Sequence, residues 1–237
     1  MADDSPTVSR ETFGPASGRA DSTLEPEPPS AQQVFGERVE LARRFTADLA
    51  QYGEQLGLIG PLEAARLWSR HIINCAVVAP FLQAGGRVAD VGSGAGLPGL
   101  VLAIARPDAH LVLIEPMERR TDWLLAETER LGLTNVTVLR ARAEEVERSG
   151  ALDDGRFDQV TARAVSALTK LIPLVAPLVR AQGELLFLKG ARVHDEVTAA
   201  AAVIRRHRLS DVEVLELGSG LVPEVTRLFR ATVGGAS

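Results

Sequence analysis

The stretch Val88-Ala89-Asp90-Val91-Gly92-Ser93-Gly94-Ala95-Gly96-Leu97-Pro98-Gly99 decides how the rest of the chain is interpreted. It begins as a short apolar strand, breaks into glycines, and resumes at Leu97 as an apolar run to Ala105. Glycine tolerates positive φ and lets a backbone pass close to a ligand, and Pro98 suits the first turn of a helix. The stretch therefore predicts a strand, a tight glycine turn and a helix N-terminus with free N–H groups, which suits a nucleotide-like cofactor.

Two classes of cofactor compete for this turn. Residues 94–99 match G-x-G-x-x-G, and Glu115 follows about 20 residues later, as in a dinucleotide site. However, Asp90 at the strand end would repel a pyrophosphate, whereas it suits a ligand with an ammonium group. S-adenosylmethionine has an amino group, a sulfonium and no phosphate, and Glu115 can accept both ribose hydroxyls. We therefore favour S-adenosylmethionine, with these residues as its contacts: Asp90, Gly92, Gly94, Leu97 and Glu115.

The composition limits the class of protein. With 237 residues, 46% of them hydrophobic, the chain can form one domain with a complete core and an appendage. No apolar run reaches the roughly 18 residues of a membrane span, and the acidic N-terminus lacks the apolar segment of a secretory signal. The single cysteine, Cys75, excludes an internal disulfide and any two-cysteine metal site. We expect a cytoplasmic monomer without a metal centre.

The charge is unevenly distributed. The net charge of −5 argues at first against a nucleic-acid partner. Residues 1–31 hold six acidic side chains and two arginines, so the remaining chain carries a net charge of only −1, with 24 basic and 25 acidic groups. Such a balance permits a basic face. Residues 1–29 are also rich in Pro, Ser and Gly and poor in apolar side chains, which predicts a disordered tail.

Helical periodicity follows the tail. From Ser30 to Leu56, apolar residues recur at three- and four-residue steps, which predicts an amphipathic helix. A second helix is predicted from Pro61, with the proline in its first turn, to about Pro80. We interpret residues 30–82 as an N-terminal helical cap over the sheet edge or over the cofactor.

Strands and helices alternate in residues 83–237, the expected cofactor-binding domain. Strands are predicted at 87–92, 110–115, 136–140, 157–163 and 183–189, and helices near 97–105, 117–131, 143–148, 167–180 and 192–208. This alternation predicts an α/β fold, a parallel sheet with helices on both faces and ligands at the carboxyl ends of its strands. Two further strands, 211–217 and 225–233, should pair antiparallel. The result is the mostly parallel seven-stranded sheet of Rossmann-like class I methyltransferases.

Further candidate site residues follow from this layout. Ala143 and Glu144, after the third strand, lie where an adenine would rest, although Glu144 could instead stabilise a helix start. Arg163 ends the fourth strand, a position that faces the reaction centre, although it could simply pair with a carboxylate. His71, next to Arg70 in the cap, could act as a base, a substrate contact or a structural hydrogen-bonding group.

Basic residues gather near the predicted carboxyl ends of the strands. They could form one rim that meets phosphates, or they could be scattered solvated charges. With Arg70 of the cap, the candidates for phosphate contacts are Arg120, Arg142 and Lys189, while similar positions hold Arg119, Arg140 and Arg192.

The absence of two catalytic motifs limits which kind of atom this chain could methylate. Methylation of a pyrimidine C5 needs a cysteine nucleophile, but Cys75 lies in the helical cap without the expected proline. Methylation of an exocyclic amine typically uses an Asn/Asp-Pro-Pro-Tyr/Phe loop after the fourth strand, where this chain reads Thr161-Ala162-Arg163-Ala164-Val165. A nucleophilic lone pair such as a purine ring nitrogen fits better, and catalysis would then be mainly positioning.

Four motifs together resemble a known family. They are Arg70-His71-Ile72-Ile73-Asn74, the stretch 90–99 with its Gly-Leu-Pro-Gly extension, Ala162-Arg163-Ala164, and Leu188-Lys189-Gly190. In this order they resemble the bacterial small-subunit ribosomal RNA guanine-N7 methyltransferases, also called glucose-inhibited division protein B, over about residues 34–233. The resemblance implies methylation of a guanine N7 in the decoding-region loop of 16S ribosomal RNA, whose alteration is linked to streptomycin response. It implies cofactor contacts at Gly92, Leu97, Ala143, Glu144 and Arg163.

The chain departs from the family at one motif, and two other functions also fit its sequence. The family often reads His-x-x-Asp-Ser where this chain reads His71-Ile72-Ile73-Asn74-Cys75, so a carboxylate role does not transfer to Asn74. A small-molecule methyltransferase would use the cap to close over its acceptor. A non-catalytic nucleotide-binding regulator would use the glycine turn alone. An assay of methyl transfer to ribosomal subunits distinguishes the RNA methyltransferase from the small-molecule methyltransferase. Calorimetry with S-adenosylhomocysteine and with NAD distinguishes both enzymes from the regulator.

Overall fold

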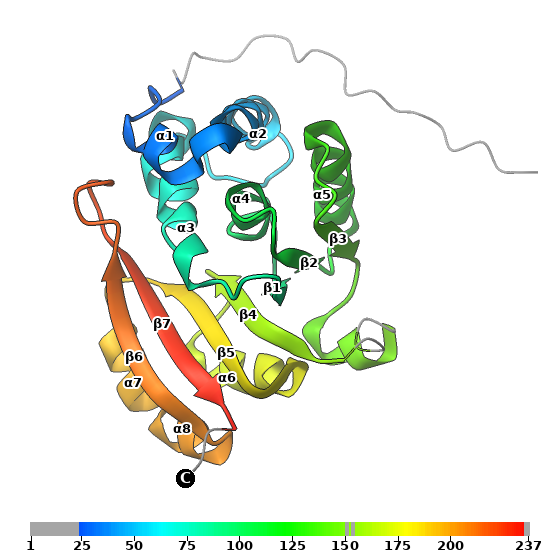
Figure 1. Ribbon diagram of the computed structural model, residues 1–237, viewed down its shortest axis with the longest axis vertical. Coiled ribbons are helices and arrows are strands. Elements are labelled where there is room, and N and C mark those ends of the chain that lie inside the picture. Colours follow the sequence, from blue (N-terminus) through cyan, green and yellow to red (C-terminus); the bar gives the residue numbers. More distant parts are fainter. Residues whose placement is uncertain (1–23, 150–151, 153–154, 235–237) are drawn as a thin grey trace, which may run out of the picture.

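A seven-stranded sheet lies at the centre of the molecule (Figure 1). The computed structural model describes residues 24–149, 152 and 155–234. The strand order is β3-β2-β1-β4-β5-β7-β6, and all neighbours pair in parallel except β7, which is antiparallel to β5 and β6. The strands are β1 (Arg87–Val91), β2 (His110–Ile114), β3 (Val136–Leu139), β4 (Phe157–Arg163), β5 (Val179–Lys189), β6 (Leu209–Leu217) and β7 (Thr226–Val233). The predicted fold class and terminal hairpin are confirmed.

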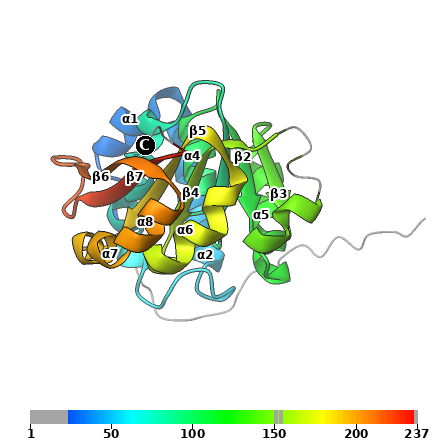
Figure 2. The same cartoon turned by 90° about the horizontal axis from the view of Figure 1, so that it is seen from below.

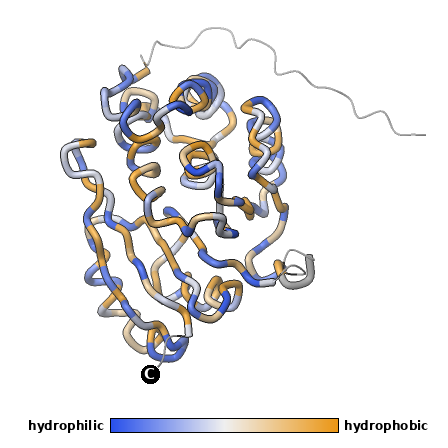
Figure 3. Tube along the Cα trace, viewed as in Figure 1, coloured by the Kyte–Doolittle hydropathy of each residue, from blue (hydrophilic) through white to orange (hydrophobic). Residues whose placement is uncertain are grey.

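The inner strands are apolar on both faces because helices cover the sheet from both sides. Alternate residues of one strand enter different hydrophobic cores: Val88 of β1 packs into the first core, and Ala89 packs into the second. Leu111 and Val112 of β2 divide in the same way. The chain at α4 (Gly99–Ala105) is mostly hydrophobic in Figure 3, since this helix is buried between the sheet and the cap.

The first core lies under the N-terminal helices. It joins α1 (Ser30–Phe35), α2 (Val39–Tyr52), α3 (Asn74–Ala76), α4 and α5 (Glu118–Leu131) to the sheet. Fully buried Phe45 of α2 and Leu113 of β2 belong to the same core. The segments 30–82 and 83–237 therefore share one core, and their separation into cap and domain remains a proposal.

The second core lies on the opposite face, seen from below in Figure 2. It is covered by the 3₁₀ helices η5 (Ala143–Ser149) and η6 (Ala176–Leu178) and by α6 (Leu168–Val175), α7 (Val193–Ala199) and α8 (Ala201–Arg206). The predicted helix at 192–208 is thus two helices that meet at Ala200, a fully buried residue.

The cap departs most from the prediction. The helix expected from Pro61 to Pro80 is instead a series of short pieces: the 3₁₀ helix η2 (Ala64–Arg66), the π-helix η3 (Trp68–Ile73), α3 and the 3₁₀ helix η4 (Ala79–Phe81). The long helix expected from Ser30 is interrupted at η1 (Gly36–Arg38), where Gly36 has φ 52°. Apolar spacing indicated the buried side correctly in both segments, but it did not reveal the changes of helix type.

The last six residues of the expected tail, 24–29, belong to the described part of the chain. Residues 24–29 make contacts with the cap: the Ser69 backbone N–H donates to Glu25 Oε2 over 2.9 Å, and Arg43 pairs with Glu27. The tail predicted at 1–29 is therefore too long at its C-terminal end, and residues 1–23 lie outside the described residues. Among the described helices, none combines the length and hydrophobicity that a membrane span requires.

Candidate active site

The glycine turn after β1 is held by backbone hydrogen bonds to the end of β2. The N–H groups of Gly92 and Ser93 donate to the Ile114 carbonyl over 2.8 and 3.2 Å. Gly92, Gly94 and Gly96 have φ values of 73°, 54° and 92°, a conformation that is strained for residues with a side chain. A Cβ on Gly92 would lie 2.8 Å from Val165 Cγ2, so the loop after β4 passes directly over the turn. Helix α4 begins at Gly99, two residues later than predicted.

Asp90 is a buried carboxylate that fixes the turn. Its Oδ2 accepts the Gly99 N–H over 3.0 Å, and its Oδ1 accepts the Thr161 hydroxyl over 3.0 Å. Burial raises the pKa of Asp90 to about 6, although hydrogen bonds from Ser93, Thr161 and Gly99 oppose that rise. Both oxygens accept hydrogen bonds from the protein and the residue is fully buried, and a contact between Asp90 and a cofactor ammonium stays a prediction.

Glu115 follows β2 and faces the same turn. Its Oε2 accepts the Gly94 N–H over 2.9 Å, and its Oε1 accepts the Met117 N–H over 3.0 Å. Each carboxylate oxygen can accept a further hydrogen bond. Glu115 therefore holds the turn in shape and retains acceptor capacity for hydroxyl groups, as the ribose prediction requires.

The remaining predicted residues lie on α5 and at or just before the start of η5, on the β2–β3 side of the sheet. Ala143 and Glu144 begin η5 directly after β3, with Ala143 packed on the second core and Glu144 exposed. Arg142 is exposed beside them. Arg120, on α5, is half-buried, and its Nε has no hydrogen-bond partner within the described chain.

Arg163 and His71 are in direct contact. Arg163 Nη2 lies 2.8 Å from His71 Nδ1 and donates to the Arg70 carbonyl over 3.2 Å, while Nη1 lies 3.0 Å from Cys75 Sγ. His71 Nε2 lies 2.6 Å from Glu63 Oε2. Both ring nitrogens are thus engaged, an arrangement that fits the structural hydrogen-bonding role among the three roles considered for His71.

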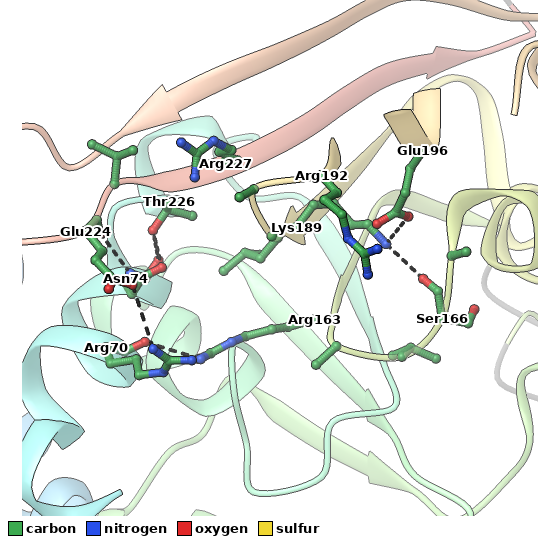
Figure 4. A pocket seen from close by; sticks show the side chains of 17 residues that line it. Arg70, Asn74, Arg163, Ser166, Lys189, Arg192, Glu196, Glu224, Thr226 and Arg227 are labelled. Atoms are coloured by element: carbon green, nitrogen blue, oxygen red, sulfur yellow. Dashed lines mark hydrogen bonds and ion pairs between the residues drawn. The ribbon is translucent and has the colours of Figure 1, made fainter. Parts of the chain in front are cut away.

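A cleft of about 710 Å³ opens beside Arg163 (Figure 4). It lies between the ends of β4 and β5 and the start of β7. Five of its lining side chains are cationic and two are acidic: Arg70, Arg163, Lys189, Arg192 and Arg227, against Glu196 and Glu224. The cleft is therefore basic, although Arg120 and Arg142 of the predicted rim do not line it.

Lys189 and Arg192 differ in whether their positive charge is paired within the protein. Lys189 is only 9% exposed, its Nζ lies 2.7 Å from Glu196 Oε2, and it donates to the Ser166 carbonyl over 2.8 Å. Its charge is therefore compensated within the protein, and a contact between Lys189 and RNA stays a prediction. Arg192 is exposed, and its guanidinium forms no hydrogen bond or ion pair within the described chain.

Sequence reasoning missed several residues of the site. Glu63 lies in a loop eight positions before His71, a spacing that indicates no contact in a regular helix. Arg227 reaches the cleft because β7 runs antiparallel beside β5, which pairs it with Lys189. Asn74, by contrast, was already singled out in the sequence: it accepts a hydrogen bond from the Thr226 hydroxyl and donates to the Glu224 carbonyl over 3.2 Å, so it ties α3 to the start of β7.

Known proteins resemble this chain over most of its length. The family model GidB, described as rRNA small subunit methyltransferase G, matches residues 38–223. A ribosomal RNA small subunit methyltransferase G from Clavibacter michiganensis subsp. michiganensis is 60% identical over 89% of this chain and 97% of that protein. A protein of the same name from Leifsonia xyli subsp. xyli is 57% identical over 89% of this chain and 98% of its own.

Solved structures share the fold at low identity. A protein from Corynebacterium glutamicum superposes with a TM-score of 0.56 at 19% identity, covering 88% of this chain and 96% of that one. A predicted O-methyltransferase from Agrobacterium tumefaciens gives a TM-score of 0.56 at 19% identity, covering 70% of this chain and 81% of its own. These likenesses support the architecture of the sheet and its helices.

Proposed function

Because the chain belongs to the GidB family of rRNA small subunit methyltransferase G, we propose that it transfers the methyl group of S-adenosylmethionine to N7 of a guanine in 16S ribosomal RNA. The substrate is the RNA or the small ribosomal subunit, and the protein acts on it as a monomer in the cytoplasm. In the described part of the chain, no three His, Cys, Asp or Glu side chains gather where they could hold a metal ion.

The glycine turn fits this methyl donor. Gly92 offers a bare backbone at the end of β1, and Glu115 keeps acceptor capacity for the two ribose hydroxyls. Ala143 and Glu144 stand at the start of η5, beyond β3, on the side expected for the adenine. When bound, S-adenosylmethionine supplies an electrophilic methyl carbon on a sulfonium.

The chain's own task is to orient the acceptor. Guanine N7 carries a lone pair and no hydrogen, so no side chain has to remove a proton. The engagement of both His71 nitrogens agrees with that chemistry. Rate enhancement then comes from holding N7 in line with the methyl group.

The basic cleft is the observation that favours an RNA acceptor over a small neutral molecule. Its excess of arginine suits a polyanion, because guanidinium groups match the geometry of phosphate oxygens. Arg192 and Arg70 both line the cleft, and they lie on opposite sides of it (Figure 4). The cleft therefore provides the entrance for the RNA strand.

Methyl transfer to ribosomal subunits tests this proposal. Small subunits from cells that lack the protein are incubated with the protein and S-adenosylmethionine, and mass spectrometry of the digested 16S RNA measures 7-methylguanosine. We expect 7-methylguanosine to appear with the wild type and not with Gly92→Asp. Methylation at another atom, or none on either naked RNA or subunits, would refute the function.

A further inference from the structure

The structure assigns Glu63 and His71 as positioning residues for Arg163, whose guanidinium they hold at the cleft to bind an anionic oxygen. This inference deepens the proposed function and rests on it for the reaction in which Arg163 takes part. The three side chains come from three separate segments: the loop before η2, the π-helix η3 and the end of β4. Their contacts are therefore a product of the tertiary fold.

The donor and acceptor chemistry fixes the state of His71. A guanidinium can only donate hydrogen bonds, so His71 Nδ1, 2.8 Å from Arg163 Nη2, must carry a lone pair. The hydrogen of the neutral ring is then on Nε2, 2.6 Å from Glu63 Oε2, which accepts it. Glu63 thereby selects the tautomer that can hold Arg163.

The surroundings favour this arrangement. His71 and Glu63 are only 13% and 17% exposed, so water competes little for their hydrogen bond. Trp68 and Ile72 of the same π-helix are buried in the first core and anchor the backbone that carries His71. π-helical turns occur frequently at functional sites. The imidazole is thus held rigidly against the arginine.

Arg163 is held by neutral acceptors only. Besides His71, these are the Arg70 carbonyl and the Cys75 sulfur. Burial raises the pKa of the Cys75 thiol, so the sulfur carries no negative charge at neutral pH. Within the described residues no carboxylate pairs with Arg163. Its geometry is fixed while its positive charge stays available to a ligand.

An anionic oxygen is the ligand that this charge suits. Methylation at N7 moves positive charge onto the guanine, so a guanidinium directly beside the base would oppose the reaction. The register pairs Asp90 with Thr161, which places Arg163 level with Gly92 at the carboxyl edge of the sheet. The carboxylate of S-adenosylmethionine and an RNA phosphate both offer such an oxygen at this edge.

The arrangement should fail in acid. The groups that face His71 are Glu63, Arg70, Arg163 and the neutral Cys75 thiol beside Arg163. Burial and then the charge of Arg163 lower the pKa of His71, in spite of the hydrogen bond to Glu63. A protonated ring would point an N–H at the Arg163 guanidinium. Methyl transfer should therefore decline as the pH falls below the usual range of histidine.

Paired variants test the inference. His71→Ala and Glu63→Ala remove the contacts, whereas His71→Asn places an amide oxygen near the Nδ1 position and Glu63→Gln keeps an acceptor for Nε2–H. His110→Asn and Glu40→Gln are matched controls, because both residues are exposed and far from the cleft. Calorimetry with S-adenosylhomocysteine, kcat and KM for small subunits, and the pH profile are measured for each.

We expect kcat/KM for small subunits to fall about tenfold or more in the two alanine variants, which is the effect of losing one hydrogen bond to a charged group. The Asn and Gln variants should recover most of the loss. His71→Asn should also decline less in acid than the wild type, and the part of the decline that comes from Asp90, whose pKa burial raises to about 6, should remain. A loss in affinity for S-adenosylhomocysteine identifies the cofactor carboxylate as the anion, whereas a raised KM for subunits with unchanged cofactor affinity identifies a phosphate.

Two results would overturn the assignment. One is that His71→Ala matches His110→Asn in every readout while Arg163→Ala is impaired. The other is that His71→Asn keeps the wild-type acidic limb. If the alanine variants fail to fold, the Asn and Gln variants still decide through the pH profile. If the wild type methylates no subunit while the alanine variants weaken binding of S-adenosylhomocysteine, the proposed function fails and the positioning role stands.

Discussion

Replacing Glu127 with glutamine should stabilise the protein at neutral pH and remove part of its pH dependence. Glu127 lies on α5 with its side chain fully buried on the side that faces α2. Arg130 Nη1 lies 3.2 Å from both Glu127 Oε1 and Asp48 Oδ1, so one cation serves two carboxylates. Burial and, after it, the Asp48 carboxylate raise the pKa of Glu127 to about 8.

The magnitude follows from proton linkage. In the unfolded chain the carboxyl titrates near 4.5, so between the two pKa values the folded protein keeps a proton that the unfolded chain has released. The free energy of unfolding therefore falls as the pH rises, by at most about 1.4 kcal/mol per pH unit. From about pH 5 to about pH 7 this group alone should cost roughly 2 to 3 kcal/mol. Glutamine is neutral throughout and carries no such slope.

Urea unfolding of the wild type and Glu127→Gln at several pH values measures this difference. The curves should nearly coincide at about pH 5 and separate by roughly 2 to 3 kcal/mol at about pH 7, with the variant more stable. Glu118→Gln is the control, because Glu118 is an exposed residue of the same helix. Parallel pH dependences for the wild type and Glu127→Gln would mean that Glu127 is already ionised in the folded protein, which would refute the burial argument.

Three further changes test the site. Gly92→Asp should abolish binding of S-adenosylhomocysteine in calorimetry while circular dichroism stays native, because bulk and negative charge enter the closest backbone approach. Gly99→Ala should lower the melting temperature, since its Cβ would lie 2.6 Å from Asp90 Oδ2, an overpacking that costs about 1 to 3 kcal/mol. Arg192→Ala should flatten the salt dependence of RNA binding by a slope of up to about 0.7 to 0.9, and Lys189→Ala, whose charge is paired with Glu196, should leave that slope unchanged.

The parts of the fold that sequence could predict are those in which local pattern and burial agree. β1, β2 and β4 are short apolar runs bounded by turns, and their predicted limits lie within one residue of the structure. β5 begins four residues earlier than expected, and its pairing with β4 shifts register between Val179 and Glu184, a segment in which Gln182 has a positive φ. The cap was misjudged because π and 3₁₀ turns keep an apolar side without keeping the α-helical period.

The site divides in a similar way. The glycine turn, Glu115 and the basic surroundings of Arg163 follow from motifs that are continuous in sequence. The charge partners do not, because Glu63 meets His71 and Glu196 meets Lys189 only through tertiary packing. Sequence therefore indicated which residues belong near the site, but it could not indicate which of their charges remain uncompensated.

The position of β7 between β5 and β6 has a consequence for synthesis on the ribosome. The parallel strands and their helices leave the ribosome first, while the hydrogen-bonding edge of β5 waits for a partner that is encoded near the end of the chain. An open strand edge recruits other chains. During synthesis the edge of β5 therefore stays open to such pairing until Thr226–Val233 emerges and closes the sheet.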